Sequence, residues 1–226
     1  MLVTDTSGSM NATDVAPSRL QAARDAAGSF LDSVPDQLQV GLVSFAESPQ
    51  TVLRPTSEHD AVRATVDGLG ADGGTGTGDA LRAALSALPP AGEGGERPPA
   101  AVVLLSDGAT TSGADPEAVA REARAQGVPV YTVALGTSDG VIRHPDGTRQ
   151  PVPPDPQALQ RIASTSGGEA FAAEDSGQLD AVYKRLGSQI GTRQEPREVT
   201  AGFAAGGLLL LVGGVGASLR FAGRLP

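Results

Sequence analysis

The chain has 226 residues, a formal net charge of −9 and no cysteine. This length allows one large domain or two small ones. The lack of cysteine excludes a disulfide scaffold, a thiolate metal site and a cysteine nucleophile. The acidic balance argues against nucleic acid as a main partner, because phosphate binding needs clustered lysine and arginine side chains.

Strand and helix patterns alternate along the first 190 residues. In the first third of the chain we expect a strand over 2–4, a helix over 18–34, a strand over 38–45, an edge strand over 51–53 and a helix from a capping box at 57–60 to Leu69. A helix over 78–88, a strand over 100–105, a helix over 115–126 and a strand over 128–135 follow. The last elements are a hairpin over 140–152 with its turn at Asp146-Gly147, a helix from Asp155 to Gly167, a strand over 169–172 and a helix over 175–190.

This alternation indicates the α/β class. The unbroken apolar run Ala100–Leu105 is typical of a central parallel strand that is buried on both faces. Strands that alternate with helices predict a doubly wound, mostly parallel, Rossmann-like sheet with helices on both faces.

The C-terminal part of the chain differs from the rest. No residue from Val199 to Leu219 is charged, and at about 1.5 Å per residue a helix of this length spans a hydrocarbon core of ~30 Å. We therefore predict a polar linker over 191–198, a transmembrane helix over 199–219 and a short basic tail over 220–226. A buried core helix is the alternative for this apolar run.

The charges that flank the predicted span suggest an orientation. Arg220 and Arg224 lie in the tail, which the positive-inside rule places in the cytoplasm. The protein would then be located in the cell membrane, with the preceding domain extracytoplasmic. Apolar residues begin at once after Met1 and no signal peptide is recognisable, so we expect the natural start to lie upstream, or else the topology to be reversed.

Polar loops follow the strands at the places where such sheets bind ligands, beyond their carboxyl ends. The loops are 5–9, 73–79 and 106–108. A strand order of 3-2-1-4-5 would make Asp5 and Asp107 face each other across one crevice. Two carboxylates with the hydroxyls of Ser7 and Ser9 form an oxygen-only set, which hard divalent cations prefer.

The segment Asp5-Thr6-Ser7-Gly8-Ser9 resembles the DxSxS signature of von Willebrand factor type A (VWA) domains, and Thr75 and Asp107 follow in the family's order. The resemblance covers residues 1–190. It implies a metal-ion-dependent adhesion site (MIDAS) that holds Mg²⁺, or Mn²⁺ or Ca²⁺, with a glutamate or aspartate of a partner protein as the final ligand. The implied metal ligands are Asp5, Ser7, Ser9, Thr75 and Asp107.

The predicted transmembrane helix over 199–219, the basic tail and the predicted hairpin over 140–152 make the chain similar, more narrowly, to one group of VWA proteins. These are bacterial membrane-anchored VWA proteins of the aerotolerance type. This resemblance implies a non-enzymatic component of a membrane-associated complex that binds protein partners through the cation. The implied partners are a MoxR-type AAA ATPase system or other membrane VWA proteins. The helix over 175–190, next to the anchor, would be a candidate relay of the signal.

Two other functions remain open. One is a scaffold subunit in which the metal is purely structural. The other is a Mg²⁺-dependent phosphohydrolase with Asp5 as nucleophile, although Ser7 stands where such enzymes place a second acid and Lys184 lies in the final helix. The isolated His59 and His144 give no support for Ser-His-Asp catalysis.

Overall fold

The computed structural model describes residues 1–90, 98–143 and 147–191. The chain divides into two units, Met1–Gly191 and Thr192–Pro226, and the fold below is that of the first unit. The predicted membrane helix over 199–219 and the basic tail lie outside the described residues. Within the described residues, no helix is long and apolar enough to cross a membrane.

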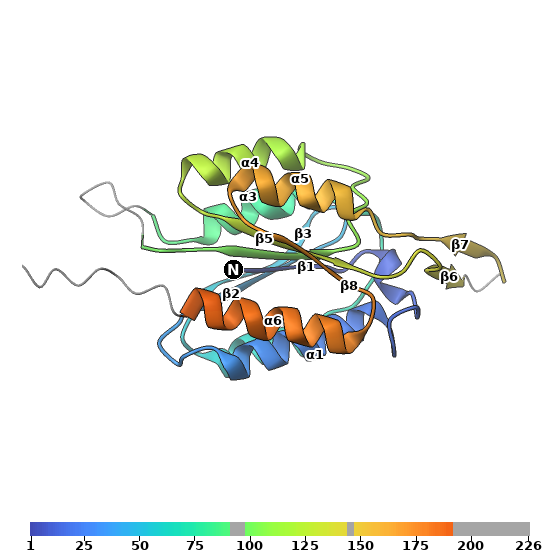
Figure 1. Cartoon of the computed structure of the whole chain (residues 1–226), viewed down its shortest axis with the longest axis horizontal. Helices are drawn as coiled ribbons and strands as arrows, with labels where there is room; N and C mark the ends of the chain where they lie inside the picture. Colours follow the sequence, from blue (N-terminus) through green and yellow to red (C-terminus); the bar gives the residue numbers. More distant parts are fainter. Residues whose placement is uncertain (91–97, 144–146, 192–226) are drawn as a thin grey trace, which may run out of the picture. The chain divides into compact units, whose positions relative to one another are not determined.

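A six-stranded sheet forms the centre of the unit, with the strand order β3-β2-β1-β4-β5-β8 (Figure 1). All neighbouring strands are parallel except β3, which runs antiparallel to β2. The predicted doubly wound, mostly parallel sheet is therefore confirmed. The strands are β1 (Leu2–Asp5), β2 (Val40–Phe45), β3 (Pro49–Thr56), β4 (Val102–Ser106), β5 (Val130–Leu135) and β8 (Ala170–Ala173).

Helices cover both faces of the sheet (Figure 1). One apolar cluster joins the sheet to α1, α2 and α6, and a second joins it to α3, α4 and α5. Side chains alternate between the clusters along each buried strand, so that Leu105 contributes to the first and Leu104 to the second. The helices are α1 (Arg19–Ser33), α2 (His59–Asp67), α3 (Thr77–Ala87), α4 (Pro116–Ala125), α5 (Pro156–Ser166) and α6 (Ser176–Gly191).

The helix ends test the predictions made from capping residues. Asp115 and Asp155 cap α4 and α5, because their carboxylates accept hydrogen bonds from the backbone of Glu117 and Ala158 at 3.1 and 3.0 Å. Gly167 ends α5 in the left-handed conformation with φ of 88°. These three predictions are confirmed.

The capping box predicted at 57–60 is wrong. Helix α2 begins at His59, with Glu58 at the N-cap and no side-chain cap. The extended backbone of β3 continues to Thr56, three residues beyond the predicted strand, and the Thr56 hydroxyl accepts the Glu58 amide at 3.0 Å. The strand therefore runs almost into the helix, which leaves Ser57 one residue too early to act as the cap.

A small hairpin extends beyond the carboxyl ends of the sheet strands (Figure 1). It consists of β6 (Val141–Arg143) and β7 (Arg149–Pro151), paired antiparallel and separate from the main sheet. Its base is closed by the Val152 amide, which donates to the Gly140 carbonyl at 2.8 Å. The predicted hairpin is thus confirmed, whereas residues 144–146, which include Asp146 of the predicted turn, are not described.

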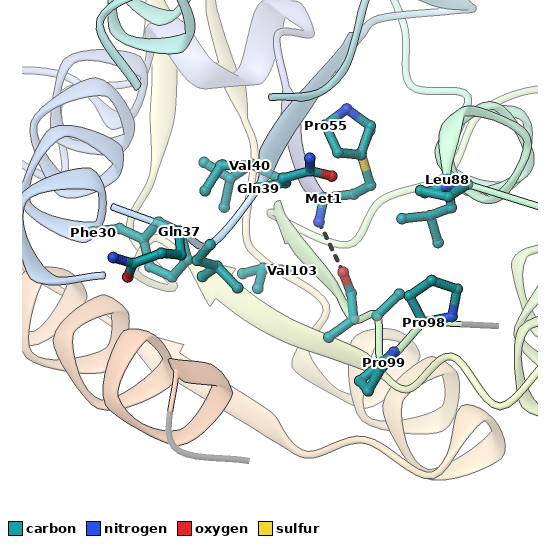
Figure 2. Close-up of a pocket in the computed structure, with 15 residues that line it drawn as sticks. Met1, Phe30, Gln37, Gln39, Val40, Pro55, Leu88, Pro98, Pro99 and Val103 are labelled. Atoms are coloured by element: carbon teal, nitrogen blue, oxygen red, sulfur yellow. Dashed lines mark hydrogen bonds between the residues drawn. The ribbon is translucent and has the colours of Figure 1, made fainter. Parts of the chain in front are cut away.

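The two ends of the central strands differ in the polarity of the side chains around them. A pocket of about 300 Å³ lies at the amino ends of β1 and β4, and apolar side chains such as Phe30, Val40 and Leu88 line it (Figure 2). Polar side chains instead gather at the carboxyl ends of the same strands, where Asp5 and Asp107 lie. The candidate site therefore occupies the polar edge and the apolar pocket lies at the opposite one.

Helix α6 is held to the domain by buried side chains. Tyr183 meets Phe30 of α1 edge to face, with ring centroids 6.0 Å apart, and Leu186 is 0% exposed. We expect Leu186→Ala to lower the free energy of unfolding by about 2–5 kcal/mol, through lost burial and a residual cavity. Urea unfolding of the full chain would measure this.

Lys184→Ala on the same helix is the matched control. Its side chain is 59% exposed and pairs with Asp180, so the substitution should cost about 1 kcal/mol or less. Equal effects of the two substitutions would contradict the packing of α6.

Candidate metal centre

The candidate site lies where two central strands end. Asp5 is the last residue of β1, and Asp107 directly follows β4, the strand beside it. A cleft of about 760 Å³ opens above these strand ends and includes Ser7, Ser9, Thr75 and Asp107 in its lining. The structure therefore brings four of the five predicted ligands to one cleft, with Asp5 beside them.

Asp5 is buried and held by hydrogen bonds. It is 0% exposed; one carboxylate oxygen accepts the Ser7 amide at 2.8 Å and the other accepts the Ser106 hydroxyl at 2.5 Å. Burial and the nearby charge of Asp107 raise the pKa of Asp5 to about 6, and the hydrogen bonds from Ser106 and Ser7 offset part of that rise. This edge of the sheet thus concentrates negative charge in a place shielded from water.

The loop after β1 directs two hydroxyls into the cleft. The side-chain oxygens of Ser7 and Ser9 lie 3.0 Å apart. The Gly8 amide between them donates to the Gly73 carbonyl at 2.9 Å, which ties this loop to the loop before α3. The first and second predicted loops therefore form one continuous surface.

The loop before α3 presents Thr75. Its amide donates to the Thr111 hydroxyl at 2.8 Å and its carbonyl accepts the Thr111 amide at 2.9 Å. In the part of the chain that the structure describes, the Thr75 hydroxyl forms no hydrogen bond. A side chain at Gly76 would place its Cβ 2.3 Å from the Glu47 carbonyl oxygen, so only glycine permits this close packing.

Asp107 completes the predicted set and contacts a residue that the sequence analysis missed. Its carboxylate accepts the Ala109 amide at 3.2 Å and the Arg19 guanidinium at 3.2 Å. Arg19 also donates to both carboxylate oxygens of Asp14, at 2.9 and 2.8 Å, and to the Val152 carbonyl at 2.9 Å. One guanidinium therefore joins helix α1, the loop after β4 and the base of the hairpin.

Arg19 lies fully inside the protein, with 0% of its surface exposed. A Cβ added at Gly136 or Gly140 would lie 2.5 or 2.2 Å from its guanidinium, so both positions must be glycine. The sequence held one signal for this role. The N-terminal end of a helix carries a partial positive charge, so a cation in the first turn is unfavourable there. An arginine directly after the Ser18 cap therefore indicates that acidic partners lie nearby.

A model of the von Willebrand factor type A domain matches residues 1–185. The chain belongs to the VWA family. A protein of Mycolicibacterium vanbaalenii described as "UPF0353 protein" is 40% identical over 237 residues, which cover 100% of this chain and 70% of that protein.

Several solved structures resemble the fold. An aerotolerance-related membrane protein from Bacteroides fragilis superposes with a TM-score of 0.73 and 25% identity, over 84% of this chain and 96% of that one. BatB from Bacteroides thetaiotaomicron has a TM-score of 0.72 at 22% identity, over 84% and 96% of the two chains. Proximal thread matrix protein 1 from the mussel byssus was solved with a zinc-occupied MIDAS motif. It has a TM-score of 0.62 at 21% identity, and the match covers 83% of this chain and 44% of that one.

The charges of the VWA site fit a divalent cation. Arg19 and Asp14 form a bidentate ion pair, in which the positive and the negative charge cancel. Burial alone would raise the pKa of Asp14, but the hydrogen bonds and charge of Arg19 and the Thr137 amide lower it overall. Asp5 and Asp107 are then left with two formal negative charges, which a divalent cation would balance.

The ligand types fit the same group of ions. The site offers two carboxylates and three hydroxyls, all hard oxygen donors. Among residues 1–90, 98–143 and 147–191, no cluster of three or more His, Cys, Asp or Glu side chains could hold a metal. Mg²⁺ takes octahedral coordination, so a set of at most five protein oxygens would leave at least one position for water or for an external group.

Other polar residues that the sequence drew attention to support neighbouring structure. The Thr77 hydroxyl lies 3.0 Å from that of Thr110, and Asp79 accepts the Ala114 amide at 3.4 Å. His59 contacts the Leu38 carbonyl at 2.7 Å, and His144 lies outside the described residues. Lys184 pairs with Asp180 at 2.8 Å on α6.

The buried ion pair of Arg19 makes a specific prediction about stability. We expect Arg19→Ala to lower the free energy of unfolding by about 3–5 kcal/mol, because it leaves the buried Asp107 and the half-buried Asp14 without their cation. Arg161→Ala removes an exposed ion pair with Glu117 and should cost about 1 kcal/mol or less. Thermal and urea unfolding would compare the two. A cost for Arg19→Ala no larger than that for Arg161→Ala would argue against the network.

Proposed function

We propose that this VWA domain binds protein partners through a divalent cation, as a component of a membrane-associated complex. The observation that carries the proposal is the convergence of three loops on one cleft, with the buried Asp5 and Asp107 beside the hydroxyls of Ser7, Ser9 and Thr75. Mg²⁺ is the proposed ion, with Mn²⁺ or Ca²⁺ as alternatives. The zinc of the mussel byssus structure supports a metal at the corresponding motif of that protein.

In this proposal the residues have distinct roles. Ser7, Ser9 and Thr75 would hold the cation directly, and Asp5 and Asp107 directly or through water. The Ser106 hydroxyl and the Ser7 amide orient Asp5, while Arg19 orients Asp107. The bound cation would supply a Lewis-acidic position to which a glutamate or aspartate of the partner can bind.

Binding is favoured over catalysis. VWA domains are generally non-enzymatic modules of protein interaction. A phosphohydrolase with Asp5 as nucleophile would need a second acid two residues later, where this chain has Ser7, whose hydroxyl instead lies beside that of Ser9. We therefore propose that the protein is not an enzyme, and that its partners are a MoxR-type AAA ATPase system or other membrane VWA proteins.

Metal binding is the first test. Calorimetry on the full chain in detergent should detect one Mg²⁺ per chain, and Asp107→Ala should weaken its binding by roughly 10–100-fold or more, since disturbing even outer groups of a metal site has that effect. Asp72→Asn removes a charge from the same cleft and should change affinity by less than about fivefold. Undiminished Mg²⁺ binding by Asp107→Ala would refute the site.

The same variants distinguish a binding site from a structural metal. Partner capture from detergent-solubilised membranes should require Mg²⁺, and should be lost with EDTA and in Asp107→Ala. In the scaffold alternative, Mg²⁺ at a hundred times its Kd would stabilise the fold by about 2.7 kcal/mol, yet captured proteins would be the same with and without it.

We further propose that residues 199–219 anchor the domain in the cell membrane, with the domain extracytoplasmic. Support comes from the uncharged run in the sequence and from the name of the Bacteroides fragilis relative, an aerotolerance-related membrane protein. The full chain should sediment with membranes, whereas a chain that ends at Gly191 should not. Protease added to intact cells without their wall should digest the domain; digestion only after lysis would reverse the topology.

A further inference from the structure

The hairpin β6–β7 lines the same cleft as the candidate ligands. Ile142, Arg143 and Gln150 line it together with Ser7, Ser9, Thr75 and Asp107. A partner segment that reaches the cation through this cleft would therefore lie next to the hairpin.

The base of the hairpin is fixed relative to the ligands. Arg19 donates to the Val152 carbonyl at 2.9 Å and to Asp107 at 3.2 Å. Asp14, which pairs with Arg19, also accepts the Thr137 amide at 2.7 Å, just before the hairpin begins. The same buried group thus positions a candidate ligand and one wall of the cleft.

The hairpin carries two arginines side by side. Arg143 and Arg149 are direct cross-strand partners, so their side chains project to the same face. Both are exposed, and within the described residues neither forms an ion pair or a side-chain hydrogen bond. By contrast, Arg82, Arg161 and Arg185 each have an acidic partner within 3.4 Å.

This placement is unfavourable for the isolated domain. Like charges directly opposite each other destabilise a pair of strands, by roughly 0.2–1 kcal/mol. In a chain whose net charge is −9, two adjacent cations that have no acidic partner among the described residues form a local exception. Such a pair of exposed cations can attract an acidic group of a partner.

The cleft lining also contains a charge of the opposite sign. Asp72 is exposed and lines the cleft together with Arg143, whereas Arg149 is not part of that lining. An acidic segment would be attracted by the arginines and repelled by Asp72.

We propose that Arg143 and Arg149 select a partner segment with several consecutive acidic residues. One carboxylate of the segment faces the cation, and its acidic neighbours contact the two guanidiniums. This inference rests on the proposed cation-dependent function and specifies its partner, an acidic peptide rather than one with a single carboxylate.

The test compares two synthetic peptides of equal length with the full chain in detergent. One carries a single glutamate among serines and glycines, and the other a run of glutamates. In Mg²⁺, fluorescence anisotropy should give a Kd for the run that is roughly tenfold lower, the gain expected from two exposed ion pairs. Added salt should reduce this gain.

The double variant Arg143→Gln/Arg149→Gln should lose the preference for the run and bind the single-glutamate peptide as before. The control Arg82→Gln/Arg161→Gln makes the same charge change on α3 and α5, and should keep the preference. Circular dichroism would show that both variants remain folded, as expected for exposed positions.

The outcomes separate this inference from the function on which it rests. Mg²⁺-dependent binding of both peptides with equal Kd would overturn the role of the arginines and leave the cation site standing. A preference for the run that persists in EDTA and disappears in the double variant would support the arginines and overturn the cation-dependent function. No binding of either peptide, with or without Mg²⁺, would overturn both.

Discussion

The buried guanidinium of Arg19 is the contact on which the polar edge of this domain depends. Removing a cation from water is costly, and the cost is offset only when its hydrogen bonds are well satisfied. Here Asp14, Asp107 and the Val152 carbonyl supply them from three separate segments. Because each segment needs the same partner, the start of α1, the loop after β4 and the base of the hairpin must be in place together.

The sheet explains why these segments meet. After β1 the chain crosses one face through α1 to β2, and between β4 and β5 it crosses the other face through α4. The loops that leave β1 and β4 therefore diverge, and a crevice opens between them at the point where the strand order reverses. Apolar packing on both faces holds this backbone, so the polar side chains need not stabilise the fold by themselves.

Much of the candidate site could be predicted because it is local in sequence. Asp5, Ser7 and Ser9 lie within one loop after a recognisable strand, and the apolar run before Ser106 indicates where Asp107 would lie. Arg19 and Val152 could not be paired in this way, because 133 residues separate them and only the folded chain brings them together. The capping box at 57–60 failed for a related reason: pairing with β2 extends β3 to Thr56, a tertiary effect that outweighs the local motif.

Asp107 is both a partner of Arg19 and a proposed ligand of the cation, and Arg19 also holds Val152 at the base of the hairpin, which links the cation to the hairpin. In the proposed function, a shift of Asp107 towards the cation would lengthen its contact with Arg19. The buried guanidinium would then be short of an acceptor, a loss that favours compensating movement at Asp14 or Val152. Partner and cation would consequently affect each other's affinity by the same factor, as linkage requires. Such coupling suits a site with few carboxylates, since a weakly held cation gains most from the ligand that its partner brings.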